Sequence, residues 1–297
     1  MEDYSTLVLT NAAGMVKTRA DAEKLLTAPV TRITIGSVRF EPCAGNSGET
    51  YWPNNRDQSA LNAIGLQSPG AVSLLDWLPS FHRECTAQGK EVAVSIAGTT
   101  PEEYRKLTVY VHPYCDILEV NAGCGNMWGL EGQKPIPSYT PELLHDILAE
   151  VARGLGGHRE KVSVKISPIG DSLIKPIADV LRSFTSLVEV IGCNTLPNQE
   201  DTRTDGTPAL AFLEPEGTEI KHTGGLSGLP LKRLSQQVLR QMIPLLPDLR
   251  FIGCGGIFTA DDLQEYIDLG AVGGAVGIAF FEQGPKVFQE ILLGLGP

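Results

Sequence analysis

The sequence predicts an α/β protein that folds as a (β/α)8 TIM barrel with long βα loops over its active face. Short β-rich runs alternate with amphipathic segments from one end of the chain to the other, an order typical of a parallel sheet. Eight such β-rich runs are present, and eight parallel strands close a barrel. The 297 residues are 42% hydrophobic and show no linker composition, so residues 1–297 are expected to form one domain.

The predicted strands are short, apolar and rich in β-branched residues. In chain order they cover residues 7–10, 32–35, 91–96, 116–121, 161–167, 188–194, 250–253 and 272–277. The predicted helices cover residues 18–26, 72–88, 101–109, 141–154, 173–183, 235–246, 260–269 and 285–292. Thr100 and Thr140 each precede a proline, which favours an N-cap hydroxyl followed by proline at the first helical position.

Three long segments, residues 42–69, 125–139 and 196–230, are rich in Gly, Pro, Asn and Thr. Each of them follows a predicted strand rather than a helix. Loops of this kind gather at the carboxyl ends of barrel strands, where barrels of this type carry their active sites. We therefore expect these segments to surround the functional site.

The formal net charge of −11, without a basic cluster, argues against binding to nucleic acid or to anionic membrane surfaces. The longest nearly apolar run, residues 271–281, is too short to cross a bilayer, and the amino-terminal residues lack the basic start of an export signal. The six cysteines form no Cys-x-x-Cys pair and the five histidines show no metal spacing, so no metal site is expected. These features predict a cytoplasmic protein with reduced thiols.

Residues 118–126 read Leu-Glu-Val-Asn-Ala-Gly-Cys-Gly-Asn, so a predicted strand ends in two amides and a thiol set among glycines. Asn121 and Asn126 can each donate and accept hydrogen bonds, which suits a flat heterocycle lined with carbonyl and N–H groups. Cys124 could move a proton. From these residues alone, the alternative is a tight turn after a buried strand, with Cys124 as a small hydrophobic residue.

Two glycine-rich segments, residues 252–257 and 273–279, coincide with the last two predicted strands. In such barrels the loops after these strands often cradle a phosphate, because glycine lets N–H groups and a helix N-terminus approach an anion closely. The pattern therefore indicates a phosphorylated cofactor. The alternative is that these glycines only allow strands and helices to pack closely.

Seven motifs follow one another along nearly the whole chain. They are Asn11-Ala12-Ala13-Gly14, Asn62-Ala63-Ile64-Gly65-Leu66, Ser95-Ile96-Ala97-Gly98, Val164-Lys165-Ile166-Ser167-Pro168, Asn194-Thr195, Gly224-Gly225-Leu226-Ser227-Gly228 and the glycine-rich residues 252–257. With these motifs in this order, the chain resembles the dihydroorotate dehydrogenase family, specifically its soluble class with a cysteine base.

The resemblance implies FMN as the cofactor and a dihydropyrimidine as the substrate. The residues that it implies for FMN binding are Ala13, Gly14, Gly36, Lys165, Cys193, Gly228, Gly255, Gly256, Gly277 and Ile278. Those that it implies for substrate binding are Asn62, Ile64, Gly65, Leu66, Asn121, Asn126, Asn194 and Thr195.

The resemblance also implies a reaction, the oxidation of (S)-dihydroorotate to orotate in pyrimidine biosynthesis. A hydride would pass to flavin N5 and Cys124 would take the neighbouring proton under a mobile lid formed by residues 125–139. Lys165 would place a positive charge near flavin N1 and C2=O. The family pattern further implies a cytoplasmic homodimer and a soluble electron acceptor such as fumarate.

Several positions depart from the family pattern. Ile35 stands where the family usually has a second lysine that contacts flavin and substrate, and Ile278 where a hydroxyl residue is common. Ala122-Gly123 and Gly125 replace the usual Leu-Ser and proline beside the thiol, which predicts a less rigidly held thiol. Two alternatives therefore stay open: an FMN oxidoreductase of this family acting on another heterocycle, which Ile35 favours, and a flavin-binding homologue without turnover.

Overall fold

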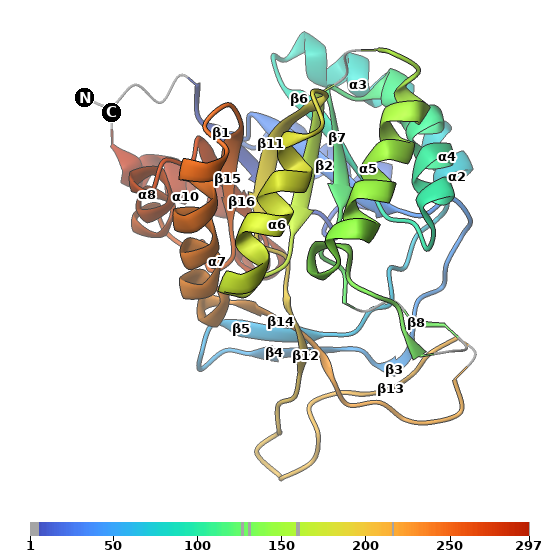
Figure 1. Ribbon diagram of the computed structural model, residues 1–297. Helices are drawn as coiled ribbons and strands as arrows, with labels where there is room; N and C mark the ends of the chain where they lie inside the picture. The colour runs from blue at the N-terminus through green and yellow to red at the C-terminus, as the bar shows by residue number, and fades with distance from the viewer. Residues whose placement is uncertain (1–5, 126–127, 130–131, 159–160, 216, 297) are drawn as a thin grey trace.

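Eight parallel strands close into a barrel in the computed structural model of the chain, which describes residues 6–125, 128–129, 132–158, 161–215 and 217–296 (Figure 1). The strands are β1 (Val8–Asn11), β2 (Arg32–Val38), β6 (Glu91–Ile96), β7 (Ile117–Asn121), β10 (Lys161–Ile166), β11 (Leu187–Gly192), β15 (Arg250–Cys254) and β16 (Gly273–Val276). Their order around the barrel is β1-β16-β15-β11-β10-β7-β6-β2, and β2 pairs with β1 to close it. The predicted fold class is confirmed, and every predicted strand overlaps one barrel strand.

Helices cover the outside of the barrel (Figure 1). They are α1 (Arg19–Leu26), α2 (Ala71–Leu75), α3 (Leu78–Ala87), α4 (Pro101–Val111), α5 (Pro141–Leu155), α6 (Asp171–Arg182), α7 (Leu229–Met242), α8 (Ala260–Asp268), α9 (Ile278–Gln283) and α10 (Lys286–Leu295). Short 3₁₀ turns are η2 (His112–Tyr114), η3 (Pro137–Tyr139) and η4 (Ile243–Leu245). No helix in the described ranges is both long and apolar enough to cross a membrane.

The predicted helices differ from the observed ones in three places. The helix predicted over residues 72–88 is divided into α2 and α3, because Trp77 leaves the helical conformation with φ −132° and ψ −24°. Helix α7 begins at Leu229, earlier than predicted, since Pro230 is compatible with a first helical turn. The short helix α9 has no counterpart among the predicted helices, because its apolar sequence continues that of the preceding strand.

The two predicted threonine caps have different outcomes. Thr100 accepts a hydrogen bond from the Glu103 amide and is followed by Pro101, as predicted. Thr140 occupies the N-cap position of α5 and Pro141 follows in the first turn, as predicted, but the Thr140 hydroxyl makes no capping hydrogen bond, so that part of the prediction is wrong. The backbone gives the reason, because Thr140 has ψ 89° whereas Thr100 has the extended ψ of 155° that an N-cap normally adopts.

The inside of the barrel holds buried polar side chains beside a small apolar cluster of Val8, Ala12, Ile191, Ile252, Cys254 and Ala275, whereas its outside is apolar. Side chains alternate along a strand, so Ile33 and Ile35 of β2 pack in the main hydrophobic core and Thr34 faces the barrel interior. The Thr34 hydroxyl lies 2.9 Å from that of Thr10 on β1. Further buried polar residues on the barrel strands are Asn11, Arg32, Ser37, Ser95, Glu119, Asn121, Ser163, Lys165 and Glu189.

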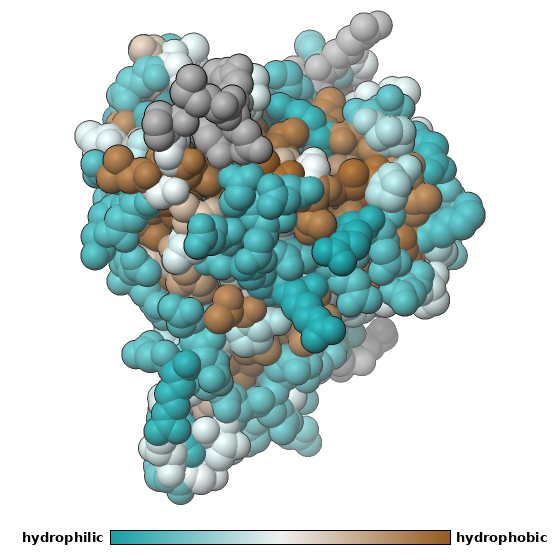
Figure 2. Space-filling model, turned by 90° about the vertical axis from the view of Figure 1, so that its left-hand side faces the viewer, coloured by the Kyte–Doolittle hydropathy of each residue, from teal (hydrophilic) through white to brown (hydrophobic). Residues whose placement is uncertain are grey.

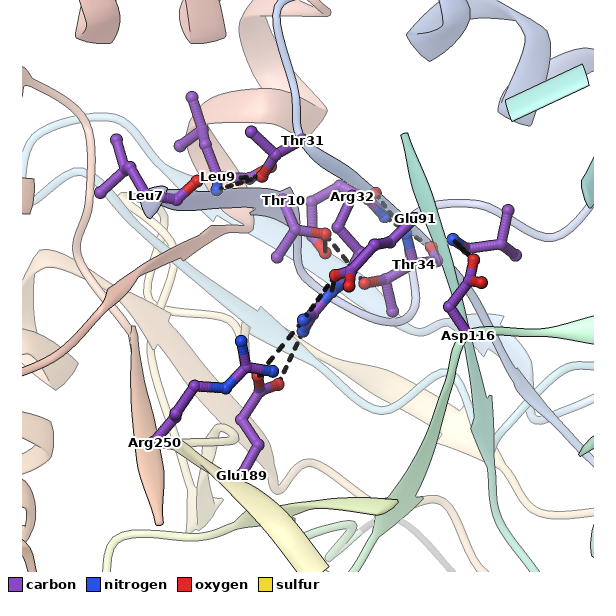
Figure 3. A network of polar contacts seen from close by, with 12 residues as sticks. Leu7, Leu9, Thr10, Thr31, Arg32, Thr34, Glu91, Asp116, Glu189 and Arg250 are labelled. Carbon is purple, nitrogen blue, oxygen red and sulfur yellow. Dashed lines mark hydrogen bonds and ion pairs between the residues drawn. The ribbon is translucent and has the colours of Figure 1, made fainter. Parts of the chain in front are cut away.

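An ion network fills the amino-terminal end of the barrel (Figure 3). Arg32 and Glu189, with exposed fractions of 1% and 0%, form an ion pair of 2.6 Å across the barrel. Glu91 lies 2.9 Å from the Arg32 guanidinium, and Arg250 lies 3.1 Å from the second Glu189 oxygen. Burial tends to lower the pKa of Arg32, but Glu189 and Glu91 together raise that pKa above its ordinary value. Arg32 and Glu189, the two fully buried charges of this network, therefore each have an opposite charge within hydrogen-bonding distance.

The three predicted loops contain strands that the sequence analysis missed. They are β3 (Ser47–Glu49), β4 (Tyr51–Asn54), β5 (Ser59–Asn62), β8 (Trp128–Gly129), β9 (Gly132–Gln133), β12 (Leu196–Gln199), β13 (Ala211–Leu213) and β14 (Gly224–Gly228). Segments far apart in sequence pair as an antiparallel sheet of order β12-β14-β5-β4 and as the pair β13-β3. These sheets lie below the barrel in Figure 1, at the carboxyl ends of its strands.

A small hydrophobic cluster supports these accessory sheets. It consists of Leu61, Ala63, Ala209, Leu210 and Phe212, with Trp52 and Leu226 packed against it. The lowest part of the molecule, where Figure 1 places the segment between β12 and β13, is mostly hydrophilic in Figure 2. The accessory sheets therefore have an apolar core of their own and a polar outer tip.

Candidate active site

A cavity of about 400 Å³ opens at the carboxyl end of the barrel. Its wall includes these sequence-predicted site residues: Ala13, Gly14, Asn62, Ile64, Gly65, Leu66, Asn121, Cys124, Lys165, Cys193, Asn194, Thr195, Gly228, Gly255, Gly256, Gly277 and Ile278. Asn126 lies outside the described residues. Gly36 does not line the cavity but lies behind Gly14, whose amide donates a 2.5 Å hydrogen bond to the Gly36 carbonyl oxygen. Folding thus gathers residues from all parts of the chain into one cavity.

The amide side chains in the cavity are oriented by hydrogen bonds. Asn121 at the end of β7 donates to the Ser37 hydroxyl at 2.8 Å and accepts from Asn194 at 3.0 Å. The Asn194 oxygen also accepts from the Thr195 amide at 2.8 Å, and Asn62 donates to the Gly225 carbonyl at 3.2 Å. Because their neighbours fix these amides before any ligand binds, they are preorganised for a planar ring with carbonyl and N–H groups.

The segment that carries Cys124 is packed tightly on both sides. A Cβ atom at Gly123 would lie 2.7 Å from the Asn194 Cβ, and one at Gly125 would lie 2.7 Å from the Pro197 Cβ. The Gly123 carbonyl accepts a 2.7 Å hydrogen bond from the Ser167 hydroxyl. The glycines that depart from the family pattern therefore let neighbouring segments approach, which contradicts the expectation of a loosely held thiol. Cys124 itself is half-buried.

The predicted lid contacts an accessory strand where it is described. Gln133 in β9 donates a 2.5 Å hydrogen bond to the Gly125 carbonyl and a 3.0 Å hydrogen bond to the Asn198 side-chain oxygen in β12. On its other side, the Ser138 amide donates to the Ala122 carbonyl at 2.9 Å. The described part of this segment thus joins the Cys124 segment to the β12 strand.

Lys165 enters the cavity from inside the barrel, with an exposed fraction of 4%. Burial lowers its pKa, but nearby Cys254, Glu119 and Cys193 together raise the pKa above its ordinary value. Burial also raises the pKa of both thiols, so they are uncharged at neutral pH, and Glu119 is the carboxyl group that acts on Lys165. Burial raises the pKa of Glu119, and the Lys165 ammonium opposes this effect.

Glycines after β15 form a backbone cradle at one end of the cavity. Gly255 and Gly256 have φ of +118° and +69°, a conformation that favours glycine. A Cβ atom at Gly256 would lie 2.6 Å from the Lys232 Cβ and 3.2 Å from the Gly228 carbonyl oxygen. No side chain caps α7, which follows Gly228, or α9, which follows Gly277. At α7 the Leu229 amide donates to the Gln58 carbonyl and Pro230 has no N–H group, so the glycine backbone around the two helix starts, rather than the first residues of α7, fits a phosphate group.

Other glycines of the same segments serve packing, so the two interpretations of the glycine-rich segments apply to different residues. A Cβ atom at Gly253 would lie 2.4 Å from the Tyr266 ring, and one at Gly274 would lie 2.6 Å from a Leu263 methyl carbon. Neither Gly253 nor Gly274 lines the cavity. The strands therefore use glycine to admit helix α8, and the loop beyond β15 uses it to shape the cavity.

The interpretation of Ile35 as the residue that replaces a cavity lysine is wrong. Ile35 is fully buried in the main core between barrel and helices and does not line the cavity. Strand alternation gives the reason, since the side chain at position 35 points away from the barrel interior. A lysine at this position would place its charge in the apolar core, so Ile35 carries no information about the substrate.

The sequence analysis missed several cavity residues. Lys17, in the connection from β1 to α1, lines the cavity and its ammonium donates a hydrogen bond to the Gln67 carbonyl. Its position in a segment that follows a barrel strand was a usable signal, because such segments meet at the active face. Ser37, which holds Asn121, gave no comparable signal, because its role depends on a contact between β2 and β7.

Two aromatic residues from distant segments also line the cavity. The ring centroids of Tyr51 and Phe281 are 5.0 Å apart, and Phe281 is largely exposed. The Tyr51 hydroxyl has no hydrogen-bond partner among the described residues. Burial raises the pKa of Tyr51 to about 12, so the hydroxyl keeps its proton at neutral pH and can donate it to a ligand. Within the described part of the chain, no cluster of His, Cys, Asp and Glu side chains is arranged to hold a metal ion.

Comparisons with known proteins agree on one family. The family model described as dihydroorotate dehydrogenase matches residues 4–296. A Clavibacter sepedonicus protein named dihydroorotate dehydrogenase (quinone) is 31% identical over 271 residues, which cover 89% of this chain and 74% of that protein. An Exiguobacterium sibiricum protein named dihydroorotate dehydrogenase B (NAD(+)), catalytic subunit, is 31% identical over 242 residues. These residues cover 79% of this chain and 70% of that protein.

A solved structure supports the fold independently. The crystal structure of DHODH from Eimeria tenella in complex with ferulenol superposes with a TM-score of 0.80. The superposition covers 97% of this chain and 80% of the Eimeria tenella chain, at 22% sequence identity. At this identity the likeness establishes the shared barrel fold.

Proposed function

The chain belongs to the dihydroorotate dehydrogenase family, and on that premise we propose that it is an FMN-dependent oxidoreductase that converts (S)-dihydroorotate to orotate in pyrimidine biosynthesis. The observation that carries the proposal is the single cavity in which the oriented amides, Cys124, Lys165 and a glycine cradle meet. A ligand that left a buried amide unpaired would lose about 1–3 kcal/mol of binding free energy. The amides of the cavity therefore suit a uracil-like ring, which can pair with them.

The cofactor proposal rests on the fit between FMN and the cavity wall. The backbone at Gly228, Gly255, Gly256 and Gly277 would hold the phosphate, since it presents N–H groups without competing side chains. Lys165 would supply positive charge on the side of the barrel interior. When bound, FMN would supply a hydride acceptor at N5. Residues 1–297 would accordingly act as one FMN-binding barrel domain.

Cys124 is proposed as the general base. A thiolate at Cys124 Sγ would take the acidic proton of the substrate ring. The ring would also lose a hydride, and the product would contain a new carbon–carbon double bond. Asn121 and Asn194 would fix the orientation of the ring, and Thr195 and the backbone of residues 64–66 would complete its pocket. The lid, residues 125–139, would exclude water during the proton transfer.

The acceptor of the electrons is a separate part of the proposal. We infer a soluble acceptor such as fumarate, used by a cytoplasmic homodimer, as the sequence motifs imply. The relatives named for quinone and for NAD(+) define the competing acceptors. A turnover assay that offers each acceptor to the same flavoprotein distinguishes them.

The first test is an anaerobic reduction of the purified protein. The bound flavin, identified by mass spectrometry, should be FMN, and its absorbance near about 450 nm should bleach when dihydroorotate is added. Bound FMN that stays oxidised with dihydroorotate but bleaches with another dihydropyrimidine would assign the protein to another heterocycle. Bound FMN that no dihydropyrimidine bleaches would assign it to a binding role. A protein that binds no flavin would overturn the proposal.

A further inference from the structure

Two layers of polar side chains lie inside the barrel at the carboxyl ends of β6, β7 and β10. In the inner layer, parallel register places Ser95 of β6 and Ser163 of β10 on either side of Glu119 of β7. The outer layer is one step closer to the cavity, and there Asn121 of β7 pairs in register with Lys165 of β10. Both residues of the outer layer line the cavity, whereas the three residues of the inner layer do not. The inner layer can therefore act on a ligand only through other side chains.

A chain of hydrogen bonds connects the two layers. The Asn121 amide nitrogen donates to the Ser37 hydroxyl at 2.8 Å, and the Ser37 and Ser95 hydroxyl oxygens are 2.9 Å apart. The Ser95 hydroxyl donates in turn to the Glu119 carboxyl, which opposes the rise in the pKa of Glu119 that burial causes. The exposed fractions of these four residues run from 0% to 6%, so they depend on one another for hydrogen bonds.

The groups at the two ends give this chain of hydrogen bonds one direction. The Asn121 nitrogen can only donate, and each serine hydroxyl has a single proton to donate. Ser95 uses its proton on Glu119, so the proton between the two hydroxyls comes from Ser37. Ser37 is thereby left as an acceptor for Asn121. It can meet the nitrogen side of that amide but not the oxygen side.

The direction of the Asn121 amide determines what the cavity presents to a ligand. With its nitrogen on Ser37, its oxygen accepts from the Gly123 amide at 3.2 Å and from Asn194 at 3.0 Å. Each side-chain amide nitrogen has two protons, and among the described residues Asn121 and Asn194 use one each in these bonds. The other protons are available for the carbonyl oxygens of a ring.

We propose that Ser95 is a positioning residue for the substrate ring, because through Ser37 it fixes the direction of the Asn121 amide, with Glu119 as the last acceptor. This inference rests on the proposed function. Ser163, the other neighbour of Glu119, takes no part, since its buried hydroxyl has no hydrogen-bond partner among the described residues. The two serines therefore match in burial and register but differ in their connection to the cavity.

The test removes one hydroxyl at a time from the FMN-loaded protein. Ser95→Ala takes away the acceptor of the Ser37 proton and should weaken orotate binding by about 3- to 10-fold, the range for one neutral hydrogen bond, as measured by isothermal titration calorimetry. The dihydroorotate concentration that half-saturates anaerobic flavin reduction should rise by the same factor. The rate at saturation should stay within about twofold of the wild-type rate, because the amide holds the ring equally before and during the reaction.

Ser163→Ala is the matched control, since it removes an equally buried hydroxyl from the other side of Glu119. This variant should bind orotate and reduce its flavin as the wild type does. Equal weakening of orotate binding in Ser95→Ala and Ser163→Ala would assign the effect to the barrel interior in general and overturn the inference. Wild-type binding in Ser95→Ala would overturn it as well.

A double variant tests the place of Glu119 at the end of the chain of hydrogen bonds. Glu119→Met removes the acceptor and keeps most of the side-chain volume, so it should weaken orotate binding. Because Glu119 also acts on Lys165, the diagnostic quantity is the further effect of adding Ser95→Ala. That addition should weaken binding no further, since both changes break the same connection. Additive losses would overturn the assignment of Glu119 as the last acceptor.

The wild-type protein distinguishes failure of this inference from failure of the proposed function. A wild-type flavoprotein that neither binds orotate nor is reduced by dihydroorotate would overturn the proposed function, and the inference with it. A wild-type protein that does both, with equal behaviour of Ser95→Ala and Ser163→Ala, would overturn the inference alone.

Discussion

The two ends of the barrel both hold cations, but they balance them differently. At the amino-terminal end, Arg32 and Arg250 share Glu189, at 2.6 and 3.1 Å, and Glu91 completes the network (Figure 3). At the carboxyl end, the wall of the cavity carries Lys17 and Lys165 and, among its described residues, no carboxylate.

The difference indicates that the amino-terminal end of the barrel contributes to stability and the carboxyl end to function. A buried cation without an anion is strongly unfavourable, and in the network around Glu189 the protein itself supplies that anion. No bound ligand is needed to balance the charges there. A cation at a cavity wall without a protein carboxylate leaves an electrostatic role for a bound anion. We therefore expect changes at the amino-terminal end to affect unfolding and changes at the carboxyl end to affect ligands and chemistry.

The largest expected effect is on chemistry at the carboxyl end. Cys124→Ala should slow anaerobic flavin reduction by dihydroorotate by about 10²- to 10⁴-fold, the range for loss of a general base. Flavin content and the free energy of unfolding should stay close to the wild-type values. Stopped-flow absorbance measures the rate, and Cys115→Ala, which removes a thiol that does not line the cavity, is the control. A wild-type rate in Cys124→Ala would show that another group takes the proton.

Breaking the network at the amino-terminal end should instead have a large effect on the free energy of unfolding. Glu189→Ala removes the anion between two guanidinium groups and should lower the free energy of unfolding by about 3–5 kcal/mol. Urea unfolding of the flavin-loaded protein measures this loss. Asp179→Ala breaks an exposed pair with Lys175 and should lose about 1 kcal/mol or less. Equal losses in both variants would mean that burial does not distinguish these pairs.

The interior cation at the carboxyl end should tune the flavin. Lys165→Met removes a charge-assisted interaction of about 1.5–3 kcal/mol with the reduced flavin. For a two-electron couple this loss lowers the reduction potential by roughly 30–60 mV, which a spectroscopic redox titration measures. Lys161→Met, at the exposed start of the same strand β10, should leave the potential unchanged. An unchanged potential in Lys165→Met would place the flavin ring away from this lysine.

The smallest expected effect comes from an ion pair that is complete at the carboxyl end. Asp262 lies 2.6 Å from Lys232, accepts hydrogen bonds from the Thr259 and Phe258 amides, and thereby joins the starts of α7 and α8. Asp262→Asn should lower the free energy of unfolding by about 1–2 kcal/mol at neutral pH.

The pH dependence of that loss follows from the pKa of Asp262. Burial raises this pKa, but Lys232 and hydrogen bonds to the carboxylate outweigh burial and hold the pKa below its ordinary value of 3.8. The stability that the carboxylate contributes is therefore present above pH 3.8 and is lost as the pH falls through the lower folded-state value. Urea unfolding at pH 7 should separate the two proteins, and unfolding at pH 3 should show a smaller difference. A difference that does not depend on pH would assign the effect to hydrogen bonds alone.

The barrel and most of its site could be predicted because they depend on local patterns. The strand from Glu91 to Ile96 alternates apolar residues in a short β-rich run, and its predicted bounds match β6. Asn121, Cys124 and Lys165 stand at or near strand ends, and parallel strands necessarily bring those ends to one face of the barrel. Sequence order was therefore sufficient to predict that these residues would meet.

The direction of a side chain and the pairing of loops were harder to predict. Ile35 was assigned to the cavity from the family pattern, as the position of a usual lysine, but its side chain points from β2 into the core. Strands β5 and β14 were predicted as loops, since each is too short and too rich in Gly, Ser and Asn to signal a strand alone. They form because each supplies the hydrogen-bond partners of the other.

The sequence by itself determined the alternation of strands and helices, the family, and the amides, thiol, lysine and glycines that meet at the cavity, because these follow from periodicity and from motifs in a fixed order. Only the tertiary structure decided that Ser37 of β2 holds the Asn121 side chain, that Ile35 lies outside the cavity, and that the charges at one end of the barrel are balanced by the protein itself. Those outcomes depend on strand register and on contacts between residues far apart in the chain, which no local pattern encodes.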